Sequence, residues 1–146
     1  MRRRLLRLAV GLVAGLALPW RALAVARNRP AFDARVLDEA LAAAGVADAE
    51  PTDALLLRAP DIAENSALVH VEIESRLPRT EVLWLFAERN PQPLVAQFDL
   101  LPGMEPFLAV RIKMNESAHL RVVARAGGRH YFVRRETKVT LGGCAG

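Results

Sequence analysis

The sequence predicts a mainly β protein: an immunoglobulin-like antiparallel β-sandwich of about seven strands, with a short N-terminal helix and a flexible C-terminal arm. Three observations indicate this fold. From residue 54 onward apolar residues alternate with polar ones, turn-forming residues interrupt this pattern at short and regular intervals, and no helical period separates the strands. Short strands without helices between them favour an antiparallel sandwich over a parallel sheet. The 146 residues suffice for one domain with its own core.

The first 24 residues, MRRRLLRLAVGLVAGLALPWRALA, have the three parts of a cleavable export signal: a basic start, an apolar run and a small-residue cleavage site. The apolar run from Leu8 to Leu18 is well short of the roughly 20 residues that a membrane-spanning helix requires. Cleavage is expected after Ala24 or Ala26. Residues 2–6, RRRLL, fit the twin-arginine (Tat) pattern, and general (Sec) secretion stays open as the alternative. We therefore expect a bacterial protein of the periplasm.

The leader also explains the high proportion of basic residues. It contains five of the 20 Lys and Arg residues and none of the 16 Asp and Glu residues, so its removal leaves 15 basic against 16 acidic side chains. Nucleic-acid and anionic-membrane partners need a basic surplus on one face. The mature chain therefore favours neither class of partner.

One helix is expected at the start of the mature chain. From Phe32 to Val46 apolar residues are three and four positions apart, and Gly45 supplies a stop signal. Residues 47–53 contain Pro51 and acidic residues without an apolar period, which indicates a connector. The mature chain is thus divided into a helix with connector at 25–53, a sandwich at 54–141 and an arm at 142–146.

The strands follow from a period of two. In LVHVEIES the residues Val69, Val71 and Ile73 share one face, which is typical of a half-buried strand. Strands are expected at residues 55–58, 68–75, 81–88, 94–100, 107–114, 119–125 and 129–141, the last bent or bulged near Arg135. A single cysteine cannot form a disulfide within the chain, so the core must depend on apolar burial. Its expected members are Trp84, Phe86, Leu108, Val110, Ile112, Val122 and Val133.

The sequence contains no recognisable catalytic, metal or cofactor motif. His70, His119 and His130 fall in or beside strands with no Cys or His at ligand spacing, so we interpret them as solvent-facing strand residues. One cysteine excludes a C-x-x-C-H haem site and a C-x-x-C redox centre, and the G-x-S-x-G and Walker patterns are missing. Glu72 and Glu74 alternate with apolar residues and indicate a solvated sheet face. We expect no metal, no cofactor and no catalytic site of the chain's own.

The only cysteine, Cys144, lies between a diglycine and the chain end. A lone cysteine can fill a core, form an intermolecular disulfide or react as an exposed group. Small terminal residues lack the apolar partners that burial needs, and an exported thiol tends to be oxidised unless something uses it. We therefore predict an exposed thiol at Cys144, acted on by other proteins, on a flexible arm made of Gly142, Gly143, Ala145 and Gly146.

Four segments carry a family resemblance. They are PDIAEN at 60–65, AERNPQP at 87–93, RIKM at 111–114 and KVTLGGCAG at 138–146. In this order and spacing they resemble the SoxY family of sulfur carriers in periplasmic thiosulfate oxidation, over residues 32–146. The resemblance implies an immunoglobulin-like sandwich that pairs with a SoxZ-like subunit and attaches its sulfur substrate covalently to Cys144.

The resemblance also implies a set of transient partners. A haem c enzyme of the SoxAX kind would conjugate thiosulfate to Cys144, a SoxB-like hydrolase would release sulfate, and, where one is present, a sulfane dehydrogenase would oxidise the remaining sulfur. The carrier itself would catalyse nothing. The chain departs from the family pattern at Ala145, where the family has glycine, and at Ser66, where glycine is expected after Asn65.

Two other functions remain open on the sequence. The chain could be an exported binding module whose Cys144 only forms an intermolecular disulfide, or an enzyme of an unrecognised kind. A sulfur donor with an activated C-terminal diglycine is disfavoured because three residues follow Gly143. The partner surface is not located by the sequence; an apolar exposed face of one sheet is expected, because stable heterodimers bury a sizeable apolar area.

Overall fold

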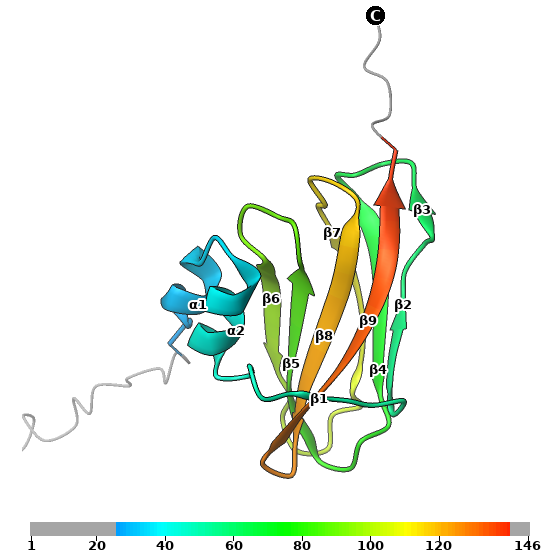
Figure 1. Ribbon diagram of the computed structural model, residues 1–146. Helices are drawn as coiled ribbons and strands as arrows, with labels where there is room; N and C mark the ends of the chain where they lie inside the picture. Colours follow the sequence, from blue (N-terminus) through cyan, green and yellow to red (C-terminus); the bar gives the residue numbers. More distant parts are fainter. Residues whose placement is uncertain (1–25, 141–146) are drawn as a thin grey trace, which may run out of the picture.

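The computed structural model, which describes residues 26–140, confirms the β-sandwich (Figure 1). Its helices are α1 (Arg29–Asp33) and α2 (Leu37–Ala44). Its strands are β1 (Glu50–Pro51), β2 (Leu55–Arg58), β3 (Ile62–Ala63), β4 (Val69–Ser75), β5 (Thr80–Ala87), β6 (Leu94–Asp99), β7 (Phe107–Ile112), β8 (Ala118–Ala126) and β9 (Arg129–Val139).

The strands form two sheets that face each other. The larger sheet has the order β1-β9-β8-β5-β6, with β3 also paired to β9, and the smaller sheet has the order β2-β4-β7. Neighbouring strands are antiparallel, except that β1 and β3 run parallel to β9. Both helices lie beside β5 and β6, on the outer side of the larger sheet (Figure 1).

The main core fills the space between the sheets. In β4, Val69, Val71 and Ile73 are at most 1% exposed, as the alternating pattern predicts. They face Leu83 and Leu85 of the larger sheet in the same cluster. Of the core residues expected from the sequence, Ile112 and Val122 belong to this buried cluster, whereas Leu108, Val110 and Val133 pack against it and are only partly buried. The last three lie on β7 and β9, near the sides of the sandwich, where fewer strands cover them.

A second core lies between the larger sheet and the helices. Trp84 and Phe86 point to this side and pack with Ala40, Leu41 and Val123. Both residues were expected in the core, and their burial, to 4% and 0% exposure, confirms this; the structure adds that they pack on the helix side of the larger sheet. Because β5 is central in its sheet and covered on both sides, all its residues from Val82 to Ala87 are buried. Such a strand shows no useful alternation in its sequence.

The single helix expected at residues 32–46 is two short helices. Asn28 caps α1 by accepting a hydrogen bond from the backbone N–H of Ala31 at 3.3 Å, and Pro30 occupies its first turn. The backbone is extended at Ala34 and Val36, between the two helices. Val36, which was expected on the apolar face of a single helix, is therefore 55% exposed. The predicted stop is confirmed, because Gly45 ends α2 in the left-handed conformation with φ of 74°.

Three details of the strands differ from expectation. The connector at 47–53 contains β1, and β3 was not expected at all. Both are two residues long, and pairing with a distant strand, rather than a local pattern, creates them. The bulge expected near Arg135 is wrong, because the pairing of β8 with β9 runs without a register shift from Arg129 to Thr137. The register shifts of the larger sheet occur in β5 instead.

Within residues 26–140, neither helix has the length and apolar character needed to cross a bilayer.

Candidate functional site: the C-terminal end of the sandwich

The predicted attachment residue lies beyond the described part of the chain. Cys144 and the predicted arm residues Gly142, Gly143, Ala145 and Gly146 all fall outside residues 26–140. The structure instead defines the residues that immediately precede them, at the end of β9. The geometry of this strand end determines where the C-terminal segment starts.

The last residues of β9 extend past the main ladder of the sheet. The final pair between β8 and β9 joins Ala118 to Thr137. Beyond it, the Ser117 side chain takes the place of a strand: its Oγ accepts a hydrogen bond from the backbone N–H of Val139 at 2.9 Å and lies 3.4 Å from the Val139 carbonyl oxygen. A hydroxyl group therefore prolongs the ladder on this edge by one step.

The opposite edge of the same segment is paired with β3. The backbone N–H of Lys138 donates to the carbonyl oxygen of Asp61 at 2.9 Å, and that of Thr140 donates to the carbonyl oxygen of Ala63 at 3.2 Å. Ala63 is only 5% exposed and packs with the inter-sheet core. Strand β3 therefore connects the end of β9 to the body of the protein.

Asn90 joins two neighbouring loops at this end. Its Nδ2 donates to the carbonyl oxygen of Lys113 at 2.8 Å, and its Oδ1 accepts from the backbone N–H of Asn115 at 2.9 Å. These bonds tie the β5–β6 loop to the β7–β8 loop. The backbone N–H of Met114 in turn donates to the carbonyl oxygen of Ser66, at 2.8 Å, and so ties the β7–β8 loop to the β3–β4 loop.

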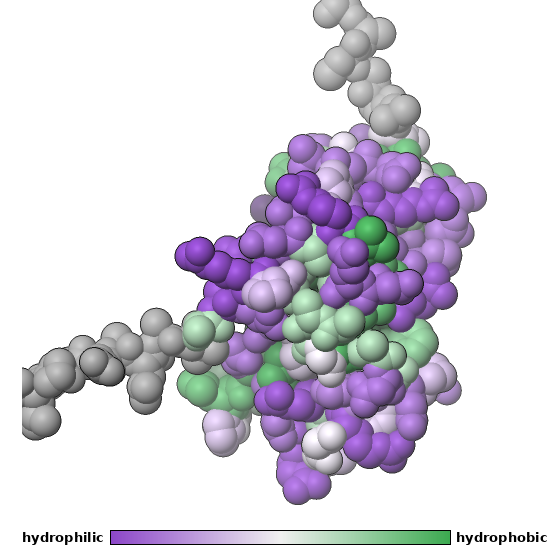
Figure 2. Space-filling model, turned by 60° about the vertical axis from the view of Figure 1, so that its left-hand side comes forward, coloured by the Kyte–Doolittle hydropathy of each residue, from purple (hydrophilic) through white to green (hydrophobic). Residues whose placement is uncertain are grey.

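The described parts of the four segments that carry the family resemblance, residues 138–140 in the case of the last one, thus meet at one end of the sandwich, the upper end in Figure 1. We call it the C-terminal end and define it as residues 59–68, 88–93, 113–117 and 138–140. On the face drawn in Figure 2 hydrophilic residues predominate at this end. Sequence reasoning quoted these segments without assigning them a common location, because only the strand register brings them together.

A charged cluster borders the C-terminal end on the outer side of the larger sheet. Glu88 accepts from Arg121 Nε at 2.9 Å and from Arg134 Nη2 at 3.1 Å, and its side chain is only 13% exposed. The Arg121 guanidinium also lies 4.9 Å from the ring centre of Phe132. These contacts join the ends of β5, β8 and β9. Because both guanidinium groups bind Glu88, the cluster is best explained as structural.

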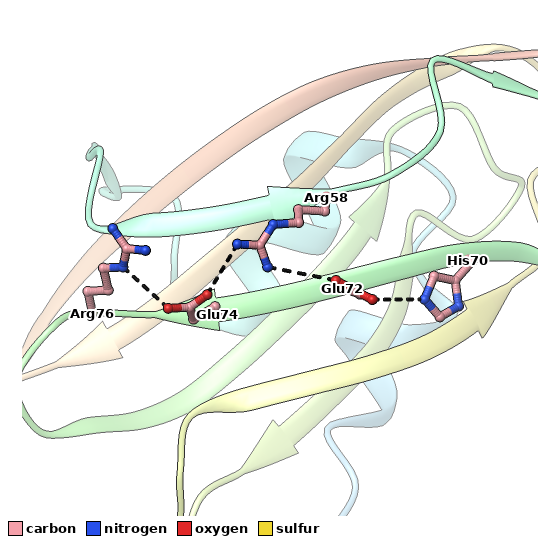
Figure 3. Close-up of polar contacts among 5 residues, drawn as sticks. All are labelled: Arg58, His70, Glu72, Glu74 and Arg76. Atoms are coloured by element: carbon pink, nitrogen blue, oxygen red, sulfur yellow. Dashed lines mark hydrogen bonds and ion pairs between the residues drawn. The ribbon is translucent and has the colours of Figure 1, made fainter.

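The outer side of the smaller sheet carries a row of charges (Figure 3). Arg58 lies between Glu72 at 3.7 Å and Glu74 at 3.5 Å, while His70 contacts Glu72 at 3.2 Å and Arg76 contacts Glu74 at 3.3 Å. Each of these side chains is about one third exposed or more. Exposed pairs of this kind stabilise a protein by about 1 kcal/mol at most. The predicted solvated face of Glu72 and Glu74 is confirmed.

His130 departs from the prediction of a solvent-facing side chain. Its side chain is only 16% exposed, its Nδ1 lies 2.8 Å from Asp48 Oδ1, and its ring packs edge-on against Trp84. The hydrogen bond to His130 lowers the pKa of Asp48 from its usual value of 3.8. Nearby, Arg129 binds Glu50 at 2.7 Å, and this contact raises the pKa of Arg129 above its ordinary value.

The other two histidines differ from each other in exposure. His70 is exposed and His119 is half-buried. Among residues 26–140 no three His, Cys, Asp or Glu side chains gather closely enough to hold a metal ion. Within this part of the chain, the C-terminal end is the candidate that both the motifs and the geometry support.

Comparison with known proteins identifies a matching family. A family model described as "Sulfur oxidation protein SoxY" matches residues 40–144. The match includes all strands of the sandwich and ends on Cys144. A search of curated proteins found no significant match.

Solved structures give two kinds of match. The sulfur carrier protein SoxY from Chlorobium limicola f thiosulfatophilum is 39% identical, with a TM-score of 0.66, over 75% of this chain and 96% of that one. A superoxide reductase (neelaredoxin) from Ignicoccus hospitalis has a TM-score of 0.51 at 19% identity, over 61% of this chain and 82% of that one. At that identity the second match demonstrates a shared fold alone.

Proposed function

The chain belongs to the SoxY family of sulfur oxidation proteins, and we propose that it holds thiosulfate-derived sulfur covalently on Cys144 and presents it to partner enzymes. The family gives it a carrier role in sulfur oxidation. The attachment residue, the partners and the periplasmic location belong to the proposal.

One observation carries this proposal. The family match continues through Cys144, which is the only cysteine of the chain. The geometry of the described residues supports it, because β3 and Ser117 hold the three residues at 138–140 from both edges. A carrier needs a fixed attachment of this kind, because the segment that carries its substrate must leave the folded domain at a defined position.

The proposed chemistry uses the thiol as an attachment point. Loading joins the Cys144 sulfur to the sulfane sulfur of thiosulfate: R–SH + S2O3²⁻ gives R–S–S–SO3⁻, one proton and two electrons. A haem c enzyme of the SoxAX kind takes the two electrons. A SoxB-like hydrolase then adds water across the terminal S–S bond, so that R–S–S–SO3⁻ + H2O gives R–S–SH + HSO4⁻. The carrier supplies the thiol and no catalytic group.

The partners follow from the same proposal. A SoxZ-like subunit forms the heterodimer, and a sulfane dehydrogenase, where present, oxidises the persulfide. The export signal at residues 1–24 delivers the chain to the periplasm, whether by the Tat or the Sec route. Glycines at 142 and 143 suit an arm that enters several active sites, because a backbone without Cβ atoms is thin.

Loading of the mature chain tests the proposal. The chain from residue 25, alone and with a SoxZ-like subunit, is incubated with thiosulfate and a SoxAX-type enzyme, and its intact mass is measured. We expect a gain of one S2O3 unit that thiol reductants remove and that the matched variant Cys144→Ser does not show. A wild-type chain that stays unmodified while the enzyme is active would contradict the proposal.

The same mass measurement distinguishes the proposed carrier from the alternative, a binding module whose Cys144 only forms an intermolecular disulfide. The alternative predicts covalent dimers and no thiosulfonate on Cys144. The departure at Ala145 gives a finer test. Its methyl group disfavours positive φ next to the thiol, so Ala145→Gly should speed loading by a standard partner. Equal loading rates for Ala145→Gly and wild type would show that the methyl group is harmless.

A further inference from the structure

The end of β9 is held by a very short strand. Strand β3 is two residues long; the carbonyl oxygen of its residue Ala63 accepts the N–H of Thr140, and that of Asp61, the residue before β3, accepts the N–H of Lys138. These bonds lie beyond Thr137, where the ladder with β8 ends. Without β3, the three residues at 138–140 would keep only the Ser117 side chain as a partner among the described residues.

The Arg135 side chain adds to the contacts between β3 and β9, which also include the backbone pairing, the packing of Ala63 and a contact of Thr140 Oγ1 with the Ala63 carbonyl oxygen. Arg135 lies on β9, and its Nη2 donates to Asp61 Oδ1 at 2.7 Å while its Nε donates to the carbonyl oxygen of Ala59 at 3.0 Å. Both acceptors lie in the segment that leads into β3. The ion pair is exposed, with 42% of the Arg135 side chain and 85% of the Asp61 side chain accessible, so it contributes about 1 kcal/mol at most. Arg135 therefore strengthens the contact between this segment and β9.

Loss of the β3 contact would move the last paired residue of β9 from Thr140 back to Thr137. At a maximum of about 3.5 Å per residue, the four residues from Thr140 to Cys144 span at most about 14 Å, whereas the seven residues from Thr137 span about 25 Å. The effective concentration of a tethered group falls roughly as the −3/2 power of tether length. Lengthening the tether from four to seven residues should therefore lower it about twofold.

We propose that Arg135 is a positioning residue: by holding β3 on β9, it sets the length and starting point of the segment that carries Cys144. This inference rests on the proposed function, because the consequence of tether length is the delivery of the sulfur cargo to partner active sites. Among residues 26–140, the hydrogen bonds of the Arg135 side chain are to Ala59 and Asp61. Arg135 acts through the backbone bonds of Lys138 and Thr140.

The chain offers a matched set of variants. Arg135→Ala removes the contact. Arg134→Ala is the control, since Arg134 is the neighbouring strand residue, similarly exposed (40% against 42%), and likewise paired with a carboxylate. Arg135→Lys keeps a donor and tests rescue. Insertion of three glycines after Leu141 lengthens the tether by the same number of residues without touching β3.

Amide hydrogen exchange and spin labelling measure the structural part in the mature protein. We expect Arg135→Ala to speed exchange at Lys138 and Thr140 up to about fivefold, because an exposed ion pair contributes about 1 kcal/mol at most. A nitroxide on Cys144 should then broaden a wider set of backbone amides. Arg134→Ala should change neither reading, and Arg135→Lys should restore part of the protection. Unchanged exchange in Arg135→Ala would overturn the proposal.

Loading by the SoxAX-type enzyme measures the functional part. We expect Arg135→Ala and the three-glycine insertion to lower kcat/KM about twofold alike, with melting temperatures close to wild type for the insertion. A loss in Arg135→Ala equal to that in Arg134→Ala would overturn the positioning role. If wild type accepts no sulfur at all, the proposed function fails, while exchange and labelling still decide whether Arg135 sets the free length.

Discussion

The two ends of the sandwich are held together in different ways. At the C-terminal end, neutral hydrogen bonds connect loops that are far apart in the sequence, such as Asn90 to Lys113, 23 residues away, and Ser117 to Val139, 22 residues away. At the opposite end the side-chain hydrogen bonds of the turns at residues 76–79 and 100–106 are local. There, Ser75 Oγ lies 2.7 Å from Thr80 Oγ1 and accepts the N–H of Leu77.

The surface of the opposite end is also different. Leu101 and Met104 are 69% and 51% exposed, and they line a groove with Leu77 and Leu100. Distant segments also meet at this end, through backbone bonds: the N–H of Arg76 donates to the carbonyl oxygen of Ala54 at 2.8 Å, and that of Ser75 donates to the carbonyl oxygen of Pro106 at 2.9 Å. The difference is therefore in the groups that make the long-range bonds. At the C-terminal end the polar side chains of Asn90 and Ser117 join segments that are distant in the sequence.

The largest expected effect is the loss of the Asn90 side chain. Asn90→Ala removes two hydrogen bonds that join the β5–β6 and β7–β8 loops, and each contributes about 1 kcal/mol, so we expect a loss of about 2 kcal/mol in the free energy of unfolding. Chemical denaturation measures it. The control Asn65→Ala removes a bond to Ala67, two residues away, and should cost less than half as much. Equal costs would show that the long-range bonds at this end have no special weight.

At the opposite end, substitution of the turn residue Gly128 should lower stability through backbone strain alone. Gly128 has φ of 77° and no atom near the place a Cβ would take, so Gly128→Ala introduces strain without a clash. We expect a loss of about 1 kcal/mol, and a smaller one for Gly128→Asn, because asparagine tolerates the left-handed region better than alanine. Thermal unfolding of both variants measures the difference. If alanine and asparagine proved equally harmful, backbone strain would not be the cause.

One change should stabilise the C-terminal end. Thr137 is fully buried, and its Oγ1 has no hydrogen-bond partner among the described residues. Thr137→Val keeps the shape and removes the unsatisfied hydroxyl, so we expect a gain of about 1 kcal/mol in the free energy of unfolding. The control Thr140→Val, one residue beyond the same strand, removes the 3.4 Å contact of its Oγ1 with the Ala63 carbonyl oxygen and should not stabilise the protein. A destabilised Thr137→Val would mean that the hydroxyl is satisfied in solution.

The smallest effect concerns pH. Because the folded pKa of Asp48 lies below 3.8 through its bond to His130, this contact stabilises the protein above that pH and is lost as the pH falls through the folded pKa. The stability difference between wild type and Asp48→Asn should therefore be constant above about pH 5 and shrink below about pH 4. Denaturation at several pH values, with the exposed Asp53→Asn as control, measures it. A difference that grew on acidification would contradict this assignment.

The sequence predicted the local elements well where a period or a turn residue marks them. Strands β2, β4 and β7 follow the period of two, and Gly45 ends α2 where expected. It predicted less well where burial is two-sided. Trp84 and Phe86 were recognised as core residues, but the sequence did not reveal that they pack on the helices, because every residue of β5 from Val82 to Ala87 is buried.

At the candidate site, the difference between what the sequence predicted and what it could not predict is larger. The sequence marked Cys144, the diglycine and the four family segments by composition and order alone. It could not show that β3 exists, that Ser117 prolongs the ladder or that Arg135 reaches Asp61, 74 residues away in the sequence. A two-residue strand has no period of its own, and an exposed arginine has no sequence pattern that names its partner.

By itself, then, the sequence determined the class of fold, the positions of the turns and the residue that offers a thiol, because these depend on local backbone preferences and residue chemistry. Only the tertiary structure decided which loops meet at the C-terminal end and how the last residues of β9 are held. Those contacts depend on the register of strands distant in the chain, and a register is set by the packing of the whole sandwich.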